Sequence, residues 1–195
     1  MDTMKTVAVY CASSTQILQK YFDAAHEVGE LLAKKGIRIV TGAGNLGLMN
    51  TVENSALEAG GTVVGVIPEF MIRENWHHTG LSELIVTADM HTRKQTIADL
   101  SNGCIALPGG CGTMEELLEV ITWKQLGLYL NPIVILNLDG FYDPLLAQLQ
   151  KAVEEHFMRD LHANIWCVAS TPAEAVELVL NTPQWDSRIR RFAAI

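Results

Sequence analysis

The sequence predicts an α/β fold in which helices cover both faces of a mainly parallel sheet of about seven strands. Short apolar runs alternate along the chain with segments of helical spacing. The runs are continuous rather than alternating in polarity, as expected for parallel strands buried on both faces. Strand–helix alternation with short connections is typical of doubly wound sheets with right-handed crossovers. We therefore expect a doubly wound, Rossmann-like three-layer sandwich.

Seven segments are expected to form the strands. They are short and apolar, and most are rich in Val or Ile, which favour extended backbone. They span residues 6–11, 37–41, 62–67, 83–88, 104–107, 132–138 and 165–169.

The helices are expected between these strands. An apolar stripe from Leu18 to Leu32 defines the first, which ends before Gly36. The last opens at Thr171-Pro172, a cap followed by a first-turn proline. The segment 68–82 matches neither pattern, and ordered loops of that length often act as lids or binding loops. The helices after the first are expected over 47–59, 90–101, 113–128, 143–157 and 173–180.

Composition predicts one domain. The chain has 195 residues, of which 49% are hydrophobic and 18% charged, so one core of ordinary size can form. We expect this domain over residues 1–182, followed by a tail over 183–195. The tail carries Arg188, Arg190 and Arg191 and is expected to be solvated or to dock on a partner.

The net charge of −8 disfavours nucleic acids and anionic membranes as partners. No apolar run approaches the roughly 20 residues that cross a bilayer, and the N-terminal sequence lacks the layout of a signal peptide. Four cysteines show neither a CxxC pair nor a framework spacing, which favours free thiols in the cytoplasm. A small anionic ligand held by a few local groups remains compatible with this charge.

In such folds, ligands bind at the carboxyl ends of the strands. The first glycine-rich segment there is 41–50, where Gly42, Gly44 and Gly47 follow a strand and open a helix. Glycines in this setting allow close approach of a phosphate to the helix N-terminus. The spacing loosely fits a dinucleotide fingerprint but follows the second strand instead of the first. The alternative is a helix entry that only needs small residues.

The second glycine-rich segment, 107–120, is more specific. Gly109, Gly110 and Gly112 lie between a strand and a helix expected to start at Thr113. Backbone N–H groups and the helix dipole converge there, which suits a phosphate. No Lys follows the last glycine, so the segment is not a P-loop.

Two side chains of this segment have competing interpretations. Thr113 and Glu116 have the spacing of a capping box, which would give Glu116 a structural role in place of a catalytic one. Cys111 lies at a helix N-terminus, where a lowered thiol pKa could make it a nucleophile. No His is placed near Cys111 by the sequence.

A third segment, 88–100, carries two adjacent cations. Asp89 is the expected N-cap, and Met90, Arg93, Lys94 and Ile97 then share one helix face. Met90 and Ile97 are expected to be buried, which directs the cations along the same face. Such cations pair with an internal carboxylate or a ligand phosphate. The alternative is an ordinary surface pair.

Together these segments resemble the LONELY GUY family of phosphoribohydrolases, once called lysine decarboxylase-like. The family patterns PGGxGTxxE and MHxRK stand here as PGGCGTMEE (108–116) and MHTRK (90–94). The chain departs from the family at Ala12, at the TGAGNLG form of the first loop and at Cys111. Further resemblance extends over 11–14, 47–49, 66–68, 119–127 and 140–146.

The resemblance implies hydrolysis of the N-glycosidic bond of a purine nucleoside 5′-monophosphate to free base and ribose 5-phosphate. Family substrates include cytokinin nucleotides and often AMP. Glu116 would stabilise the charged sugar and activate water, and Arg93 would orient the ligand and assist the departing base. No metal and no cofactor are expected, and family members are homodimers.

The resemblance also implies a set of substrate contacts, with the glycine loop holding the 5′-phosphate. The main alternative is a non-catalytic carrier of a nucleotide or nucleotide cofactor. Decarboxylation of lysine is disfavoured, because no lysine has the setting that pyridoxal phosphate needs. The implied contacts are Ser13, Gly42, Gly44, Gly47, Glu74, Met90, Arg93, Lys94, Gly109, Gly110, Cys111, Gly112, Thr113, Glu115 and Thr122.

Overall fold

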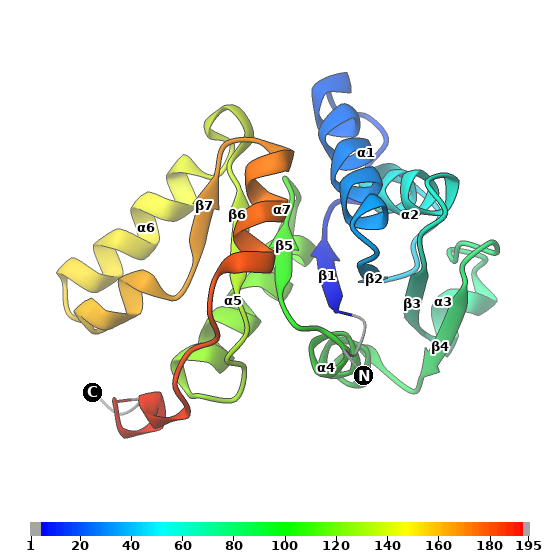
Figure 1. Ribbon diagram of the computed structural model, residues 1–195. Helices are drawn as coiled ribbons and strands as arrows, with labels where there is room; N and C mark the ends of the chain where they lie inside the picture. Colours follow the sequence, from blue (N-terminus) through cyan, green and yellow to red (C-terminus); the bar gives the residue numbers. More distant parts are fainter. Residues whose placement is uncertain (1–4, 193–195) are drawn as a thin grey trace.

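The computed structural model describes residues 5–192 and contains a seven-stranded sheet with helices on both faces (Figure 1). Every strand pair in this sheet is parallel, which confirms the predicted fold class. The strand order is β4-β3-β2-β1-β5-β6-β7. The strands are β1 (Thr6–Tyr10), β2 (Arg38–Thr41), β3 (Val63–Pro68), β4 (Glu83–Thr87), β5 (Cys104–Ala106), β6 (Ile133–Leu136) and β7 (Cys167–Ala169).

The strand order reverses between β1 and β5. Strands β2, β3 and β4 extend the sheet to one side of β1, and the chain then returns to pair β5 with the other side. Tyr10 and Ala106, the last residues of β1 and β5, lie side by side. The chain after β1 continues to α1 on one face of the sheet, and the chain after β5 continues to α5 on the other face. A crevice for a ligand forms at such a switch point.

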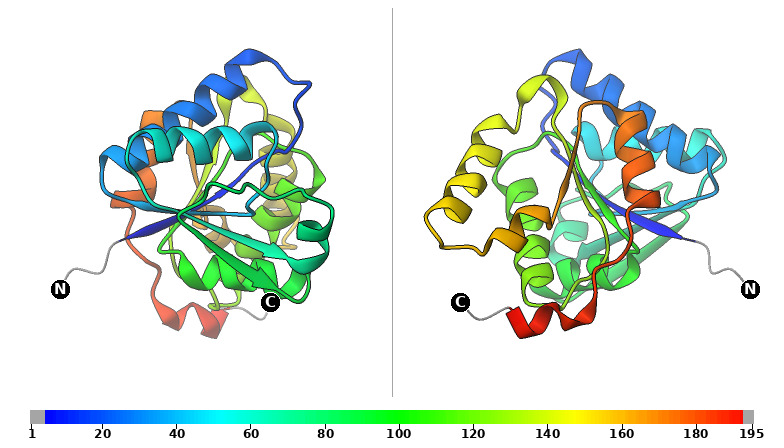
Figure 2. Two further views of the ribbon diagram at one scale, coloured as in Figure 1. Left: turned by 90° about the vertical axis from the view of Figure 1, so that its right-hand side faces the viewer. Right: turned by 60° about the vertical axis from the view of Figure 1, so that its left-hand side comes forward.

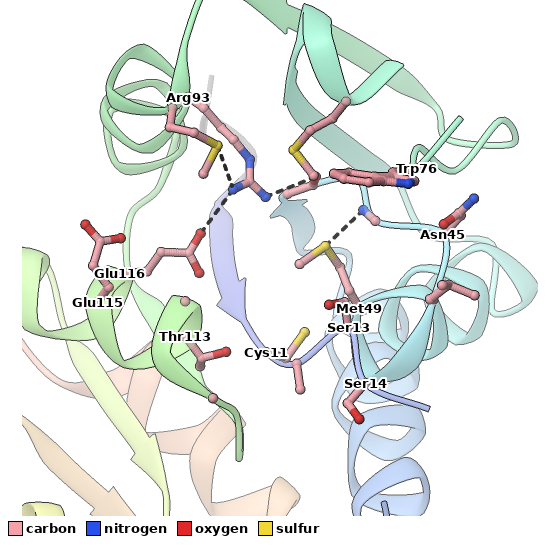
Figure 3. Close-up of a pocket in the computed structure, with 18 residues that line it drawn as sticks. Cys11, Ser13, Ser14, Asn45, Met49, Trp76, Arg93, Thr113, Glu115 and Glu116 are labelled. Atoms are coloured by element: carbon pink, nitrogen blue, oxygen red, sulfur yellow. Dashed lines mark hydrogen bonds and ion pairs between the residues drawn. The ribbon is translucent and has the colours of Figure 1, made fainter. Parts of the chain in front are cut away.

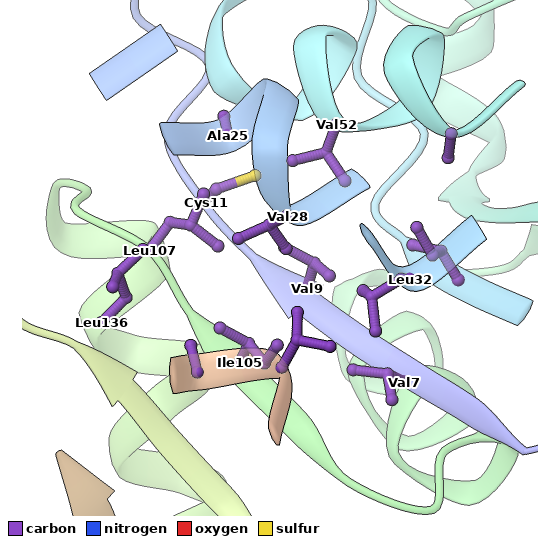
Figure 4. Packing of buried hydrophobic residues seen from close by; sticks show 14 of the residues in the cluster. Val7, Val9, Cys11, Ala25, Val28, Leu32, Val52, Ile105, Leu107 and Leu136 are labelled. Atoms are coloured by element: carbon purple, nitrogen blue, oxygen red, sulfur yellow. The ribbon is translucent and has the colours of Figure 1, made fainter. Parts of the chain in front are cut away.

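The helices form two layers, seen on opposite faces of the sheet in Figure 2. Because side chains alternate along a strand, β1 supplies both layers. Val7 and Val9 pack with the layer shown in Figure 4, whereas Ala8 and Tyr10 pack on the other. The first layer holds α1 (Gln19–Lys34), α2 (Gly47–Glu58) and α7 (Pro172–Asn181), and the second holds α4 (Met90–Leu100), α5 (Cys111–Gln125) and α6 (Asp143–Glu154).

Local capping chemistry explains two helix starts. Asp89 accepts a hydrogen bond from the Thr92 N–H at 2.7 Å, and Thr171 accepts one from the Glu174 N–H at 3.2 Å. Both predicted caps are therefore confirmed. Between residues 5 and 192, no helix has the length and apolar character needed to cross a membrane.

Three expectations were wrong. Strands β4 and β7 are not buried on both faces, because they are the two edge strands: Val86 in β4 is 52% exposed and Val168 in β7 is 40% exposed. The segment 68–82 contains a short helix, α3 (Glu69–Arg73), and is not wholly irregular. Helix α5 begins at Cys111 and not at Thr113.

The predicted tail, from residue 183 onward, packs partly against the domain instead of being fully solvated. Trp185 packs against the second-layer core, and Ile189 is buried. The ammonium of Lys124 lies 5.2 Å from the Trp185 ring centroid, a cation–π distance. The tail up to Ile189 thus contacts its own domain, while residues 193–195 of the predicted tail lie outside the described part of the chain.

Candidate functional site

A cavity of about 570 Å³ lies at the carboxyl edge of β1, β2 and β5 (Figure 3). This volume is in the usual range of small-molecule sites. Its walls come from five segments that are far apart in sequence, and the cavity therefore occupies the crevice created by the strand reversal. The segments are 11–14, 42–49, 71–76, 90–93 and 110–116.

Arg93 lies in the first turn of α4 and is almost fully buried. Its Nε donates to the Val66 carbonyl at 3.0 Å, and its Nη2 donates to the Gly42 carbonyl at 3.2 Å. These two bonds fix the plane of the guanidinium, because its donors have a rigid fork geometry. The remaining nitrogen, Nη1, is directed toward α5.

Glu116, from the second turn of α5, faces Arg93. Its Oε1 lies 3.6 Å from Arg93 Nη1, and both side chains are at most 10% exposed. This distance is too long for a hydrogen bond, so the pair is held by charge attraction and the carboxylate keeps free lone pairs toward the cavity. Burial raises the pKa of Glu116 to about 7, against the opposing charge of Arg93. The carboxyl group therefore changes charge near neutral pH.

The capping-box interpretation of Glu116 is wrong. The N-cap of α5 is Gly110, no side chain caps the helix, and Thr113 is its third residue. A capping box needs the hydroxyl at the N-cap position, and Thr113 lies past it. Helix capping therefore does not explain why Glu116 is buried beside Arg93.

The second glycine loop is open toward the cavity. A Cβ added at Gly110 or Gly112 would meet no atom within 4 Å, whereas one at Gly109 would lie 2.2 Å from the Thr113 hydroxyl oxygen. The first N–H groups of a helix have no partner within it. At the start of α5 these amides and the positive end of the helix dipole adjoin the open glycines, an arrangement suited to an anion.

The first glycine loop is tightly packed against protein groups. A Cβ at Gly42 would lie 1.6 Å from Arg93 Nη2, and one at Gly44 would lie 2.9 Å from the Met49 sulfur. Gly47 has a φ of +64°, and its added Cβ would lie 2.4 Å from the Ser13 carbonyl carbon. These glycines let the loop pack closely against Arg93 and against the segment after β1. The need for small residues at this helix entry is thereby explained.

Part of the segment 68–82 forms one wall of the cavity. Trp76 and Met71 line it, whereas Glu74 is exposed and does not. The Trp76 carbonyl accepts from the Asn45 N–H at 3.0 Å, and His77 bridges to Gly44, so this segment is fastened to the first glycine loop. The sequence signal that could have identified Trp76 is a tryptophan in a long irregular segment, a type of segment that often forms a lid or binding loop.

Ten of the predicted site residues line the cavity, and six do not. The sequence interpretation missed Cys11, Ala12, Ser14, Asn45, Leu46, Met49, Met71 and Trp76. The residues brought together are Ser13, Gly42, Gly44, Met90, Arg93, Gly110, Gly112, Thr113, Glu115 and Glu116; those outside the lining are Gly47, Glu74, Lys94, Gly109, Cys111 and Thr122.

The residues outside the lining have other contacts. Lys94 is buried and binds the carboxylates of Glu115 and Glu119, the latter at 3.1 Å, so its anionic partners are internal. Thr122 is exposed, and its hydroxyl donates to the Leu118 carbonyl at 2.8 Å. Met90, expected to be buried, is 36% exposed because it begins α4 beside the cavity.

The cysteines near the cavity are poorly placed to act as nucleophiles. Cys111 is exposed and lies outside the cavity lining. Cys11 does line the cavity. Burial raises the pKa of its thiol well above the usual value, and the negative charges of Glu53 and Glu116 raise that pKa further. Among the residues that the structure describes, no three His, Cys, Asp or Glu side chains are grouped to hold a metal ion.

Comparison with known proteins identifies relatives over most of the chain. The family model described as "Possible lysine decarboxylase" matches residues 49–179. The cytokinin riboside 5′-monophosphate phosphoribohydrolase of Rhodococcoides fascians is 47% identical over 158 residues, covering 80% of this chain and 79% of that protein. A probable enzyme of the same name from Oryza sativa subsp. japonica is 43% identical over 189 residues, covering 96% of this chain and 78% of that protein.

Solved structures share the fold. The Moco Carrier Protein from Chlamydomonas reinhardtii superposes with a TM-score of 0.71 at 25% identity, covering 91% of this chain and 96% of that one. The family match covers well over half of the chain, and the relatives exceed 40% identity over most of it. This chain belongs to the LONELY GUY family, whose model is described as "Possible lysine decarboxylase".

Proposed function

We propose that this protein hydrolyses the N-glycosidic bond of a purine nucleoside 5′-monophosphate, of cytokinin type or AMP, to free base and ribose 5-phosphate. The observation that carries the proposal is the buried Arg93–Glu116 pair beside the open glycine loop of one cavity. The names of the relatives from Rhodococcoides fascians and Oryza sativa support the same reaction.

The chemistry follows from the charge that develops during cleavage. Loss of the base builds positive charge on the ribose, and a nearby carboxylate stabilises it. Glu116 provides this carboxylate and accepts a proton from the attacking water. Arg93 has one N–H-bearing nitrogen, Nη1, that is not bound to a carbonyl, and it donates from there to the ligand. Its charge also favours the ionised form of Glu116.

The two ends of the cavity differ in polarity, which orients the nucleotide. The N-terminus of α5, with Gly110, Gly112 and the Thr113 hydroxyl, takes the 5′-phosphate. Leu46, Met71 and Trp76 supply apolar lining. Figure 3 shows Trp76 across the cavity from Thr113, and a planar base with an apolar substituent would fit against this side chain. The sugar then lies between Arg93 and Glu116, the groups that act on it.

The test is release of free base. Purified protein is incubated with AMP and with isopentenyladenosine monophosphate, and adenine or isopentenyladenine is followed by chromatography. Glu116→Gln and Arg93→Ala should each lower kcat/KM by roughly 100-fold or more, the usual size of such contributions. Glu154→Gln, an exposed carboxyl-to-amide change on α6, is the matched control and should retain the wild-type rate. Absence of base release from either nucleotide contradicts the proposal.

The carrier alternative is addressed by the same experiment. The shared fold with the Moco Carrier Protein is the observation behind it. A carrier would bind the nucleotide without releasing base. Binding of AMP measured by calorimetry together with no base release would therefore favour the carrier over the hydrolase.

We also propose a homodimer in the cytoplasm. Leu118 on α5 and Leu126 directly after it are exposed, as are Leu84 and Val86 on edge strand β4, so apolar surface is available for a second copy. Light scattering should give twice the chain mass of 21.4 kDa, and a monomer at micromolar concentration would contradict the dimer. The four cysteines are all free, in line with a reducing compartment.

A further inference from the structure

Glu53 is a fully buried carboxyl group that the proposed chemistry does not use. It lies on α2, is 0% exposed and does not line the cavity. Its Oε1 accepts a hydrogen bond from the Thr41 hydroxyl at 2.5 Å, whereas its Oε2 has no partner among the described residues. Burying a carboxyl group with an unsatisfied oxygen is unfavourable for folding, so its presence calls for another explanation.

The hydroxyl of Thr41 connects Glu53 to the first glycine loop. While it donates to Glu53, it accepts from the Ala43 N–H at 3.1 Å. Ala43 is buried with a φ of +57°, a left-handed conformation that alanine rarely adopts. A hydroxyl can donate and accept at once, which a residue of the same shape such as valine cannot. The Glu53–Thr41 pair thus holds the loop in an otherwise disfavoured turn.

This turn determines the positions of two groups in the cavity. The residue between Thr41 and Ala43 is Gly42, whose carbonyl accepts from Arg93 Nη2 at 3.2 Å. On the other side, the Ala43 carbonyl accepts from the His78 N–H at 2.9 Å, which fastens the loop that carries Trp76. A change in the backbone at residues 41–43 would therefore displace the Arg93 guanidinium relative to Glu116.

We infer that Glu53 and Thr41 are positioning residues for the hydrolysis, acting through Gly42 on Arg93. The inference rests on the proposed function of Arg93 and Glu116. Displacement of a reacting group by about 1 Å can lower a rate by about 100-fold, so loss of the Thr41 hydroxyl should reduce kcat. Most of the affinity for ribose 5-phosphate is expected from its phosphate at the N-terminus of α5, away from this pair, so its Kd should change little although the sugar lies beside Arg93.

The experiment compares variants that remove the connection with variants that keep it. Thr41→Val and Glu53→Leu preserve approximate shape but delete the hydroxyl or its acceptor, and kcat for base release should fall by roughly tenfold or more. Thr41→Ser and Glu53→Gln keep the hydrogen bonds and should recover at least about a third of the wild-type kcat. In all four variants the Kd of ribose 5-phosphate, measured by calorimetry, should stay within about threefold of wild type. Thr51→Val, on the same helix as Glu53, is the control, because its hydroxyl donates to the carbonyl of Gly47 in its own helix at 3.0 Å.

The outcomes separate a positioning role from a structural one. Wild-type kcat in both Thr41→Val and Glu53→Leu would overturn the inference. A parallel loss of kcat, ribose 5-phosphate binding and thermal stability, without recovery in Thr41→Ser and Glu53→Gln, would also overturn it. If wild-type protein releases no base, the proposed function fails, and amide hydrogen exchange of residues 42–45 then decides the positioning role. Faster exchange in Thr41→Val than in Thr41→Ser is expected, and equal exchange would contradict it.

Discussion

The two glycine-rich loops of the site use glycine for opposite purposes. In the loop after β2, an added methyl group would collide with protein atoms at Gly42, Gly44 and Gly47. In the loop that leads into the first turn of α5, Gly110 and Gly112 face open space. The first loop is therefore a packed support that positions Arg93 and Trp76, and the second is a bare surface left free for a ligand. Similar glycine content in sequence thus corresponds to different physical roles.

The largest effect is expected from a substitution that disrupts the packed loop after β2. Gly42→Ala places a Cβ where Arg93 Nη2 lies, so the guanidinium must move. We expect kcat/KM for base release to fall by about 100-fold, since the orientation of Arg93 toward Glu116 is lost. Steady-state kinetics check the rate, and circular dichroism checks that the variant is folded. A wild-type rate in a folded variant would show that the contact at Gly42 is not needed.

A smaller effect is expected at the wall that the packed loop supports. Trp76→Ala removes the aromatic face and should raise KM for the nucleotide by roughly tenfold, within the range measured for stacked bases, while kcat changes less. Trp76→Phe should lie between the two. Phe157→Ala, which removes an exposed aromatic ring outside the cavity lining, is the control and should leave KM unchanged. Equal KM values in Trp76→Ala and wild type would exclude stacking on this residue.

Each of the two loops lies beside a buried carboxyl group, Glu53 or Glu116, and the dependence of stability on pH reports on both groups. Burial raises the pKa of Glu53 to about 8 and that of Glu116 to about 7, from an ordinary value of 4.5. Between pH 4.5 and these values the folded state holds protons that the unfolded chain has released. The free energy of unfolding contributed by these groups therefore falls as pH rises through this range.

Activity should show the opposite trend. The ionised form of Glu116 is the proton acceptor, so kcat/KM should rise with pH through a midpoint near 7. Urea unfolding across the same pH range, compared with Glu53→Gln and Glu116→Gln, measures the stability part, and each variant should flatten the decline. A rate that decreases as pH rises through neutrality would contradict Glu116 as the base.

The smallest effect is expected from a substitution at the open glycines near the start of α5. Gly112 is the second residue of α5 and has free space for a methyl group. Gly112→Ala should raise the free energy of unfolding by roughly 0.5–1 kcal/mol, because alanine loses less backbone entropy in a helix. The same methyl group enters the cavity and should weaken nucleotide binding. Urea unfolding and calorimetry measure the two changes, and a destabilised variant would show that this loop is packed after all.

Much of the fold could be predicted because buried parallel strands leave continuous apolar runs, and all seven runs became strands. The edge strands β4 and β7 are more exposed than expected, because pattern alone does not reveal which strands lack an outer neighbour. Arg93 and Glu116 were predicted from their motifs and are brought together in one pair. Their separation of about 23 residues in sequence carries no information about the 3.6 Å between their charged atoms.

Other residues of the site could not be predicted, for identifiable reasons. The start of α5 was misplaced because Thr113 has good capping chemistry, yet the helix starts two residues earlier with Gly110 as its N-cap, and the Thr113 side chain lies against Gly109. Glu53 resembles any solvent-facing residue of an amphipathic helix, and its burial depends on the hydroxyl that ends a neighbouring strand. Lys94 has the same motif as Arg93, but tertiary packing directs it to Glu115 and Glu119.

The order of the site's segments along the chain also determines when the Arg93–Glu116 pair can form during synthesis. Arg93 and its carbonyl partners at Gly42 and Val66 belong to segments made before β5. Glu116 is translated later, on the helix that follows the strand inserted beside β1. A nascent chain that has left the ribosome only as far as α4 therefore contains the guanidinium and lacks the carboxylate. A truncated product of this kind would be inert, so release of free base requires that translation has passed α5.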